Sequence, residues 1–161
     1  MDSIKLFSTG GTISKRYDEI SGELLFDEHH INKMLTQGRC TANITVTSLM
    51  LKDSLEMTDT DRELLFNSVQ NTTTTNILIT HGTDTMIESA KKLSFINDKT
   101  IVLTGAMIPY AFKNSDALFN IGASITATLA LSHGTYICMN GQIFPWDKVI
   151  KNKKEGYFET I

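Results

Sequence analysis

The feature that most constrains the fold is an alternation of short apolar runs with longer segments of helical periodicity. The runs are rich in Ile, Val, Leu or aromatic residues, and each ends in a polar or small residue of the kind that starts a turn. They cover residues 4–9, 43–50, 76–82, 100–107 and 134–140. Between them, apolar side chains recur at helical spacing. These segments cover residues 26–38, 58–70, 83–95 and 114–134.

Strands and helices in this order predict a single-domain α/β fold. Several of the runs are apolar almost throughout, which is typical of strands covered on both faces of a parallel sheet. We expect a doubly wound, mostly parallel sheet of the Rossmann or flavodoxin kind, with helices on both faces and right-handed crossovers. The length of 161 residues is sufficient for one domain with a substantial core.

The helical segments also carry signals for their ends. Thr60 and Glu63 have the spacing of a capping box, and Thr85 and Glu88 repeat it. Gly38 follows the first helical segment, where a glycine commonly ends a helix.

Three segments lie outside the strand and helix pattern. Residues 14–25 are polar and contain a glycine, so they predict a mobile loop or a small hairpin. The low-complexity stretch 71–76 predicts a connection between a helix and a strand. Residues 147–161 contain four lysines and three acids, which favours a solvated tail, with Trp146 as a packing anchor in front of it.

Composition and charge favour a cytoplasmic protein and argue against several other classes. Fifteen basic and 18 acidic residues leave a net charge of -3, which argues against a dedicated nucleic-acid binder. No basic segment followed by an apolar one marks a signal peptide, and no apolar run is long enough for a membrane span. Cys40 and Cys138 are far apart and lack CxxC spacing, so we expect reduced thiols and neither a disulfide framework nor a metal site.

Polar clusters follow the first four predicted strands. They read STGGT, KDSLEMT, THGTDT and TGAM, and in an open parallel sheet such positions line the ligand crevice. The TGGT cluster lacks the glycine spacing of a phosphate-binding loop, and an acidic receiver pocket is missing after the first strand. Two interpretations of this segment remain: a tight turn without further function, and a loop that presents a threonine nucleophile. For a nucleophile, Gly10 and Gly11 would let the backbone approach a substrate and offer N–H groups to an oxyanion.

Four motifs together resemble the bacterial-type L-asparaginase family. They are TGGTI at 9–13, HGTDT at 81–85, DSLEMT at 53–58, and TGAMIP with NSDALFNI between 104 and 121. The similarity runs through nearly all of residues 1–161 and corresponds to the larger, N-terminal domain of that family, without its smaller C-terminal domain. It implies hydrolysis of asparagine, or of glutamine or a related amide, to the acid and ammonia, with no metal or organic cofactor.

The resemblance also implies the catalytic residues. Thr12 would be the primary nucleophile on a flexible loop, and Thr83 the second hydroxyl, activated through a lysine that Asp84 holds. Lys151 is the lysine that best matches the family spacing, and Lys148 is the alternative.

Substrate binding would use Thr83 and Asp84 again, with Asp84 accepting hydrogen bonds from the amino group. Ser54 would bind the carboxylate. Gly11 and Glu56 match further substrate-binding positions, and Glu56 replaces an aspartate of the family. His81 either binds substrate or is a structural residue.

Some positions depart from the family pattern. Tyr17 is the candidate for the family's catalytic tyrosine, because it lies in the same loop, but local alignment places Glu23 at the position of that tyrosine. Leu55 replaces a residue that is often polar in the family. Family members complete each site with a neighbouring subunit, so the resemblance implies a homo-oligomer. The departures leave two alternatives: an amino-acid-binding domain with weak or no catalysis, and a subunit that needs a partner chain.

Overall fold

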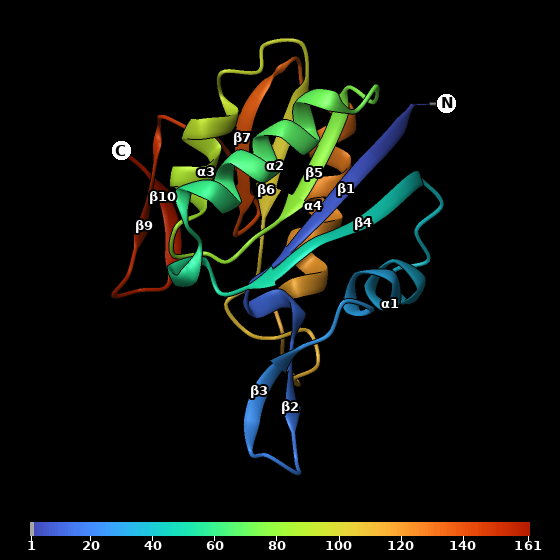
Figure 1. Ribbon diagram of the computed structural model, residues 1–161, viewed down its shortest axis with the longest axis vertical. Coiled ribbons are helices and arrows are strands. Elements are labelled where there is room, and N and C mark those ends of the chain that lie inside the picture. Colours follow the sequence, from blue (N-terminus) through green and yellow to red (C-terminus); the bar gives the residue numbers. More distant parts are fainter. Residues whose placement is uncertain (1) are drawn as a thin grey trace.

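The computed structural model describes residues 2–161, which fold around a six-stranded sheet (Figure 1). The strands lie in the order β4-β1-β5-β6-β7-β8, and all neighbours are parallel except β7 and β8. Their bounds are β1 Ser3–Gly10, β4 Asn43–Lys52, β5 Asn76–Thr80, β6 Thr100–Thr104, β7 Gly134–Met139 and β8 Gln142–Pro145. This is the doubly wound, mostly parallel sheet that the sequence predicts.

Two helices cover each face of the sheet. They are α1 His30–Gln37, α2 Asp59–Asn71, α3 Met86–Leu93 and α4 Ala117–Ala130. Helices α2 and α3 pack on one face in a core cluster with Ile77 and Ile79, while α1 and α4 pack on the other with Leu78. Successive residues of β5 therefore point into opposite cores, and burying each such side chain stabilises the fold by about 1.5–3 kcal/mol.

The strand order reverses between β1 and β5. From β1 the chain crosses to β4 on one side, and from β4 it returns to β5 on the other side of β1. In an open parallel sheet this reversal leaves a crevice at the carboxyl ends of the two strands. The loops that follow β1 and β5 begin at this crevice.

The polar segment 14–25 folds as a hairpin, one of the two forms predicted for it. Strands β2 Lys15–Asp18 and β3 Glu23–Phe26 pair with each other and with no strand of the large sheet. The hairpin turns at Gly22, whose φ is 73°. Figure 1 shows the hairpin projecting from the body of the molecule, on the side where the 105–116 loop also lies.

The segment 71–76 connects α2 to β5, as predicted. Lys99 holds it in place, because the buried ammonium donates hydrogen bonds to the carbonyls of Thr72, at 2.8 Å, and Thr74, at 3.3 Å.

The prediction of a solvated tail is wrong. Residues after Trp146 form a second hairpin, β9 Val149–Asn152 and β10 Tyr157–Thr160, with Val149 and Phe158 buried in the α2–α3 core. The Asn140 side chain also accepts a hydrogen bond of 2.8 Å from the Phe158 N–H. Two apolar residues on one face of the hairpin outweigh the four lysines around them. Trp146 packs on this core, as expected of an anchor.

The helix ends differ in detail from the prediction. The capping box of α2 joins Thr58 and Asp61, two residues before the predicted pair, because Thr60 already lies inside the helix. The Thr85 hydroxyl makes no cap, since it donates instead to the Ser54 carbonyl at 2.8 Å. Helix α1 does end at Gly38, although the left-handed backbone falls on Arg39, at φ 52°.

Candidate active site

The two loops at the crevice touch through their glycines. Gly11 follows β1 with φ 75°, and a Cβ built on it would lie 2.4 Å from the backbone nitrogen of Gly82. Only glycine allows both this backbone conformation and this approach. Thr12 and Thr83 come next along the two loops, so the fold brings both predicted nucleophile positions to one place.

Thr12 begins η1, a 3-10 turn over Thr12–Ser14, and is half-buried. The N–H of Lys15 donates to the Thr12 carbonyl and closes the turn. The expectation that the Gly11 N–H faces a developing oxyanion is wrong, because it donates to the Lys52 carbonyl at 2.9 Å. That bond fixes the start of the loop against the end of β4.

Thr83, Asp84 and Lys151 form one hydrogen-bonded cluster. Lys151 Nζ lies 2.8 Å from Thr83 Oγ1 and 2.8 Å from Asp84 Oδ1. Thr83 is buried, and the Lys151 side chain is only 11% exposed, although it comes from β9. The exposed Lys148, the alternative named from the sequence, is not part of these contacts.

This arrangement suits the activation of a hydroxyl. A threonine hydroxyl is a weak nucleophile unless a neighbouring base accepts its proton. Lys151 Nζ donates a hydrogen bond to Thr83 Oγ1, and its bond to the Asp84 carboxylate fixes the direction of the amine. Asp84 remains 37% exposed, so it also has free oxygen surface for a ligand amino group.

Ser54 lies beside the second loop, at the start of η2 Ser54–Glu56. It is buried, and its hydroxyl accepts a hydrogen bond from the Thr85 N–H at 3.3 Å. A Cβ on Gly82 would lie 2.6 Å from the Ser54 Cβ, so the serine packs directly on the backbone that carries Thr83. Leu55, at 70% exposure, and Glu56 follow on the surface of the same turn.

His81 is a structural residue in this fold. Its ring is buried, with Nδ1 donating to the Gly82 carbonyl at 2.7 Å and Nε2 accepting from Ser89 Oγ at 2.7 Å. Burial lowers the pKa of His81 to about 4, so the ring is neutral near pH 7. Nδ1 therefore positions the glycine before Thr83, and Nε2 fixes the ring against Ser89 of α3.

Tyr17 and Glu23 lie apart from this cluster. Both are exposed on the β2–β3 hairpin, Tyr17 at 54%, and Tyr17 stands opposite Leu24 in the strand register. The hydrogen bonds within residues 2–161 join neither side chain to Thr12 or Thr83.

Two charged residues at the site were not found from the sequence. Lys15 Nζ and Asp53 Oδ2 form an ion pair of 2.8 Å between the hairpin and η2. The hydrogen bond from Lys15 is the main cause of a lowered pKa for the Asp53 carboxyl, with the Leu55 N–H and the charge of Lys151 adding to it. No sequence pattern marks Lys15 as part of the site, because its contact with Asp53 depends on the direction of the β2–β3 hairpin.

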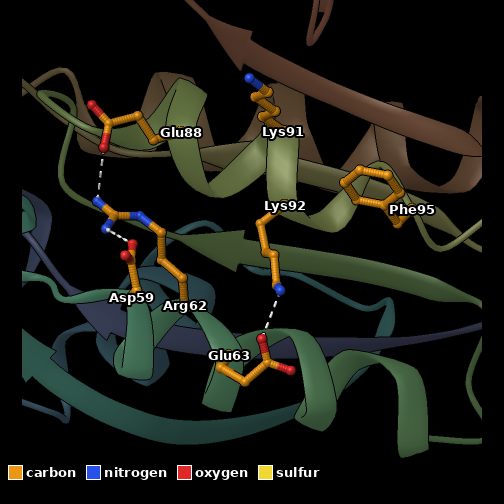
Figure 2. A pocket seen from close by; sticks show the side chains of 7 residues that line it. All are labelled: Asp59, Arg62, Glu63, Glu88, Lys91, Lys92 and Phe95. Carbon is orange, nitrogen blue, oxygen red and sulfur yellow. Dashed lines mark ion pairs between the residues drawn. The ribbon is translucent and has the colours of Figure 1, made fainter.

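A separate groove lies between α2 and α3 (Figure 2). It measures about 460 Å³ and is crossed by ion pairs from Arg62 to Glu88, at 3.1 Å, and from Lys92 to Glu63, at 2.6 Å. These contacts join the two helices, and none of the described residues that line the groove carries a hydroxyl group. A second hollow, of about 680 Å³, contains Asp84 and Lys151 in its wall.

Helices of the described chain, residues 2–161, include none that is long and apolar enough to cross a bilayer. In the same residues, no group of three His, Cys, Asp or Glu side chains is placed to hold a metal ion.

The chain is thus a doubly wound α/β protein with hydroxyl, amine and carboxylate groups gathered at the switch point of its sheet. The chain belongs to the asparaginase family, since the model of the family described as "Asparaginase, N-terminal" matches residues 3–158. The sequence resemblance is thereby confirmed.

Individual relatives agree with this assignment. The chain is 30% identical to a subunit of the glutamyl-tRNA(Gln) amidotransferase of Methanococcus vannielii, over 97% of this chain and 38% of the relative. It is 28% identical to a glutaminase-asparaginase of Acinetobacter glutaminasificans, over 93% and 50%. The solved structure of the thermostable L-asparaginase from Thermococcus kodakarensis superposes with a TM-score of 0.88 at 27% identity, over 99% and 51%. The chain thus spans about half or less of the length of these relatives.

Proposed function

We propose that the protein is an amidohydrolase that converts asparagine, or glutamine or a related amide, to the acid and ammonia. The observation that carries this proposal is the contact of Lys151 with both Thr83 and Asp84 beside the loop of Thr12. Family membership supports the same chemistry, and names of relatives include asparaginase and glutaminase-asparaginase.

In the proposed reaction the Thr12 hydroxyl attacks the amide carbon. The C–N bond then breaks, the nitrogen takes up the proton that the Thr12 hydroxyl loses and leaves as ammonia, and an ester to Thr12 remains. Water next attacks the ester, and its proton passes through Thr83 Oγ1 to the Lys151 amine and from there to the departing Thr12 oxygen. The acid is released and Thr12 regains its proton, so the cycle needs no cofactor.

The ligand groups that we propose are those of an amino acid. The part-exposed Asp84 carboxylate would accept hydrogen bonds from the ammonium group, and Ser54 would donate to the carboxylate. Gly11 lets the loop of Thr12 lie against the backbone of Gly82, and Glu56 would contribute from the exposed surface of η2.

Ammonia release from a small panel of amides tests the proposal. We expect Thr12→Ala and Thr83→Val to abolish release while far-UV circular dichroism stays unchanged. Thr126→Ala, an exposed threonine on α4, is the matched control and should retain full activity. Wild-type protein that releases no ammonia from asparagine, glutamine or their close analogues would overturn the proposal.

We also propose that residues 1–161 act as one domain in a cytoplasmic homo-oligomer. Apolar side chains are exposed near the site, including Leu55, Met107 and Ile108, and a second copy would cover them. Light scattering of purified protein checks the oligomer.

The cytoplasmic location is supported by the two cysteines. Both Cys40 and Cys138 are free thiols, which is typical of proteins in a reducing compartment.

A second candidate is a binding subunit that acts with a partner chain. It is favoured by the similarity to an amidotransferase subunit and by the short span relative to that relative. In that case calorimetry should detect aspartate binding without ammonia release, and light scattering should show a monomer.

A further inference from the structure

We propose that Lys15 and Asp53 form a latch that fixes Thr12 and the base of the β2–β3 hairpin against η2. Both are positioning residues, because neither needs to contact the substrate. The kinetic part of this inference rests on the proposed function, whereas its structural part does not.

Lys15 connects three parts of the site. Its backbone N–H donates to the carbonyl of Thr12, so the residue closes the turn that presents the nucleophile. Its side chain, 18% exposed, reaches Asp53 at 2.8 Å. Lys15 Nζ also lies 5.6 Å from the centre of the Phe26 ring, and Phe26 stands opposite Lys15 in the hairpin.

Asp53 receives the lysine from a fixed position. One carboxylate oxygen accepts from Lys15, and the other accepts from the Leu55 N–H at 3.1 Å, which caps η2. Ser54 is the first residue of that turn. A single carboxylate therefore links the Thr12 turn to the turn that positions the buried serine beside Gly82.

The hairpin has little else to fix its direction. Strands β2 and β3 bond only to each other in the sheet pattern of residues 2–161. At its base, the Asp27 N–H donates to the Ser14 carbonyl at 2.8 Å, a bond that holds the two strands together. Within residues 2–161, the Lys15–Asp53 pair is the ion pair that ties the hairpin to η2, directly after β4.

The neighbouring pair offers a matched control. Lys52 Nζ lies 2.9 Å from both oxygens of Asp61, so it ties β4 to the start of α2, and within residues 2–161 its side chain forms no hydrogen bond or ion pair with the hairpin. Lys52→Met alters the net charge by the same amount as Lys15→Met, at the position next to Asp53.

Hydrogen exchange of residues 15–26, followed by mass spectrometry, tests the latch in the full chain. We expect exchange to become about 5-fold to 10-fold faster in Lys15→Met and in Asp53→Asn. The double variant should be no faster than either single variant, because the two residues act together. Lys15→Arg should restore most of the protection, and Lys52→Met should leave this segment unchanged.

The kinetic readout is a fall in kcat of the same order in Lys15→Met, with less change in KM, and again no further fall in the double variant. Unchanged exchange of residues 15–26 in both single variants, or additive effects in the double variant, would overturn the latch. If the wild-type protein releases no ammonia, the proposed function is overturned. The latch is then tested by the hydrogen-exchange result alone.

Discussion

Lys151 Nζ lies 2.8 Å from the Thr83 hydroxyl oxygen, although 68 positions separate the two residues in the chain. Lys151 comes from the β9–β10 hairpin and Thr83 from the loop after β5, so the contact depends on the whole sheet between them.

Lys151→Met should reduce kcat for ammonia release by about 100-fold or more, the usual contribution of a general base. Aspartate affinity should change little, because the lysine acts on the transition state rather than on the bound ligand. Steady-state assays and calorimetry measure the two quantities. Lys148→Met is the control, and an equal loss of turnover in that variant would contradict the assignment to Lys151.

Gly11→Ala should destabilise the fold by more than the cost of a left-handed alanine alone. That cost is about 1–2 kcal/mol, and a Cβ at Gly11 would also meet the backbone of Gly82 at 2.4 Å. Gly22 is the control, since its φ is 73° and a Cβ there meets nothing within 4 Å. Urea unfolding of Gly11→Ala and Gly22→Ala separates the clash from the strain. Equal losses would show that the two loops do not constrain each other.

His81 should make the protein less stable as the pH falls from about 6.5 to about 4. Its pKa is about 4 when folded and near 6.5 when unfolded, so in this range only the unfolded chain binds the proton. The loss amounts to at most about 3 kcal/mol. Burial lowers the pKa of His30 as well, which adds a smaller effect of the same sign.

Urea unfolding at several pH values measures this dependence. His81→Gln should flatten most of the slope, and the exposed His29→Gln should retain it. A slope that is the same in all three proteins would contradict the origin in His81.

Lys99→Met should lower the free energy of unfolding by about 1–3 kcal/mol, because it removes the donor that the buried Lys99 side chain supplies to the carbonyls of the half-buried Thr72 and Thr74. The exposed Lys91→Met is the control. Loss of protection of residues 71–76 in hydrogen exchange should accompany the destabilisation, and normal protection there would contradict this account.

Much of the fold could be read from the sequence because local patterns determine it. Apolar runs predict β5 and β6, each buried on both faces, and the alternation with helical segments predicts the crossovers. The terminal hairpin was missed because its buried residues, Val149 and Phe158, lie among lysines and only tertiary packing separates the two kinds of side chain.

The sequence predicts the site residues that lie in family motifs. It does not predict the residues that reach the site through contacts between distant segments. Thr83, Asp84 and Lys151 follow from family motifs, and the structure joins them. The ion pair of Lys15 with Asp53 depends on the direction of the β2–β3 hairpin, which no local pattern specifies. The same limit applies to the Gly11 N–H, whose partner is the carbonyl of Lys52 on β4.

The origin of Lys151 in a late hairpin has a consequence for biosynthesis. A ribosome adds about 5–20 residues per second, so the 68 positions between Thr83 and Lys151 correspond to roughly 3–14 s of translation. During that interval the nascent chain already carries both threonines but lacks the amine that contacts Thr83. The cluster of Thr83, Asp84 and Lys151 therefore cannot form until all six strands of the large sheet have been synthesised.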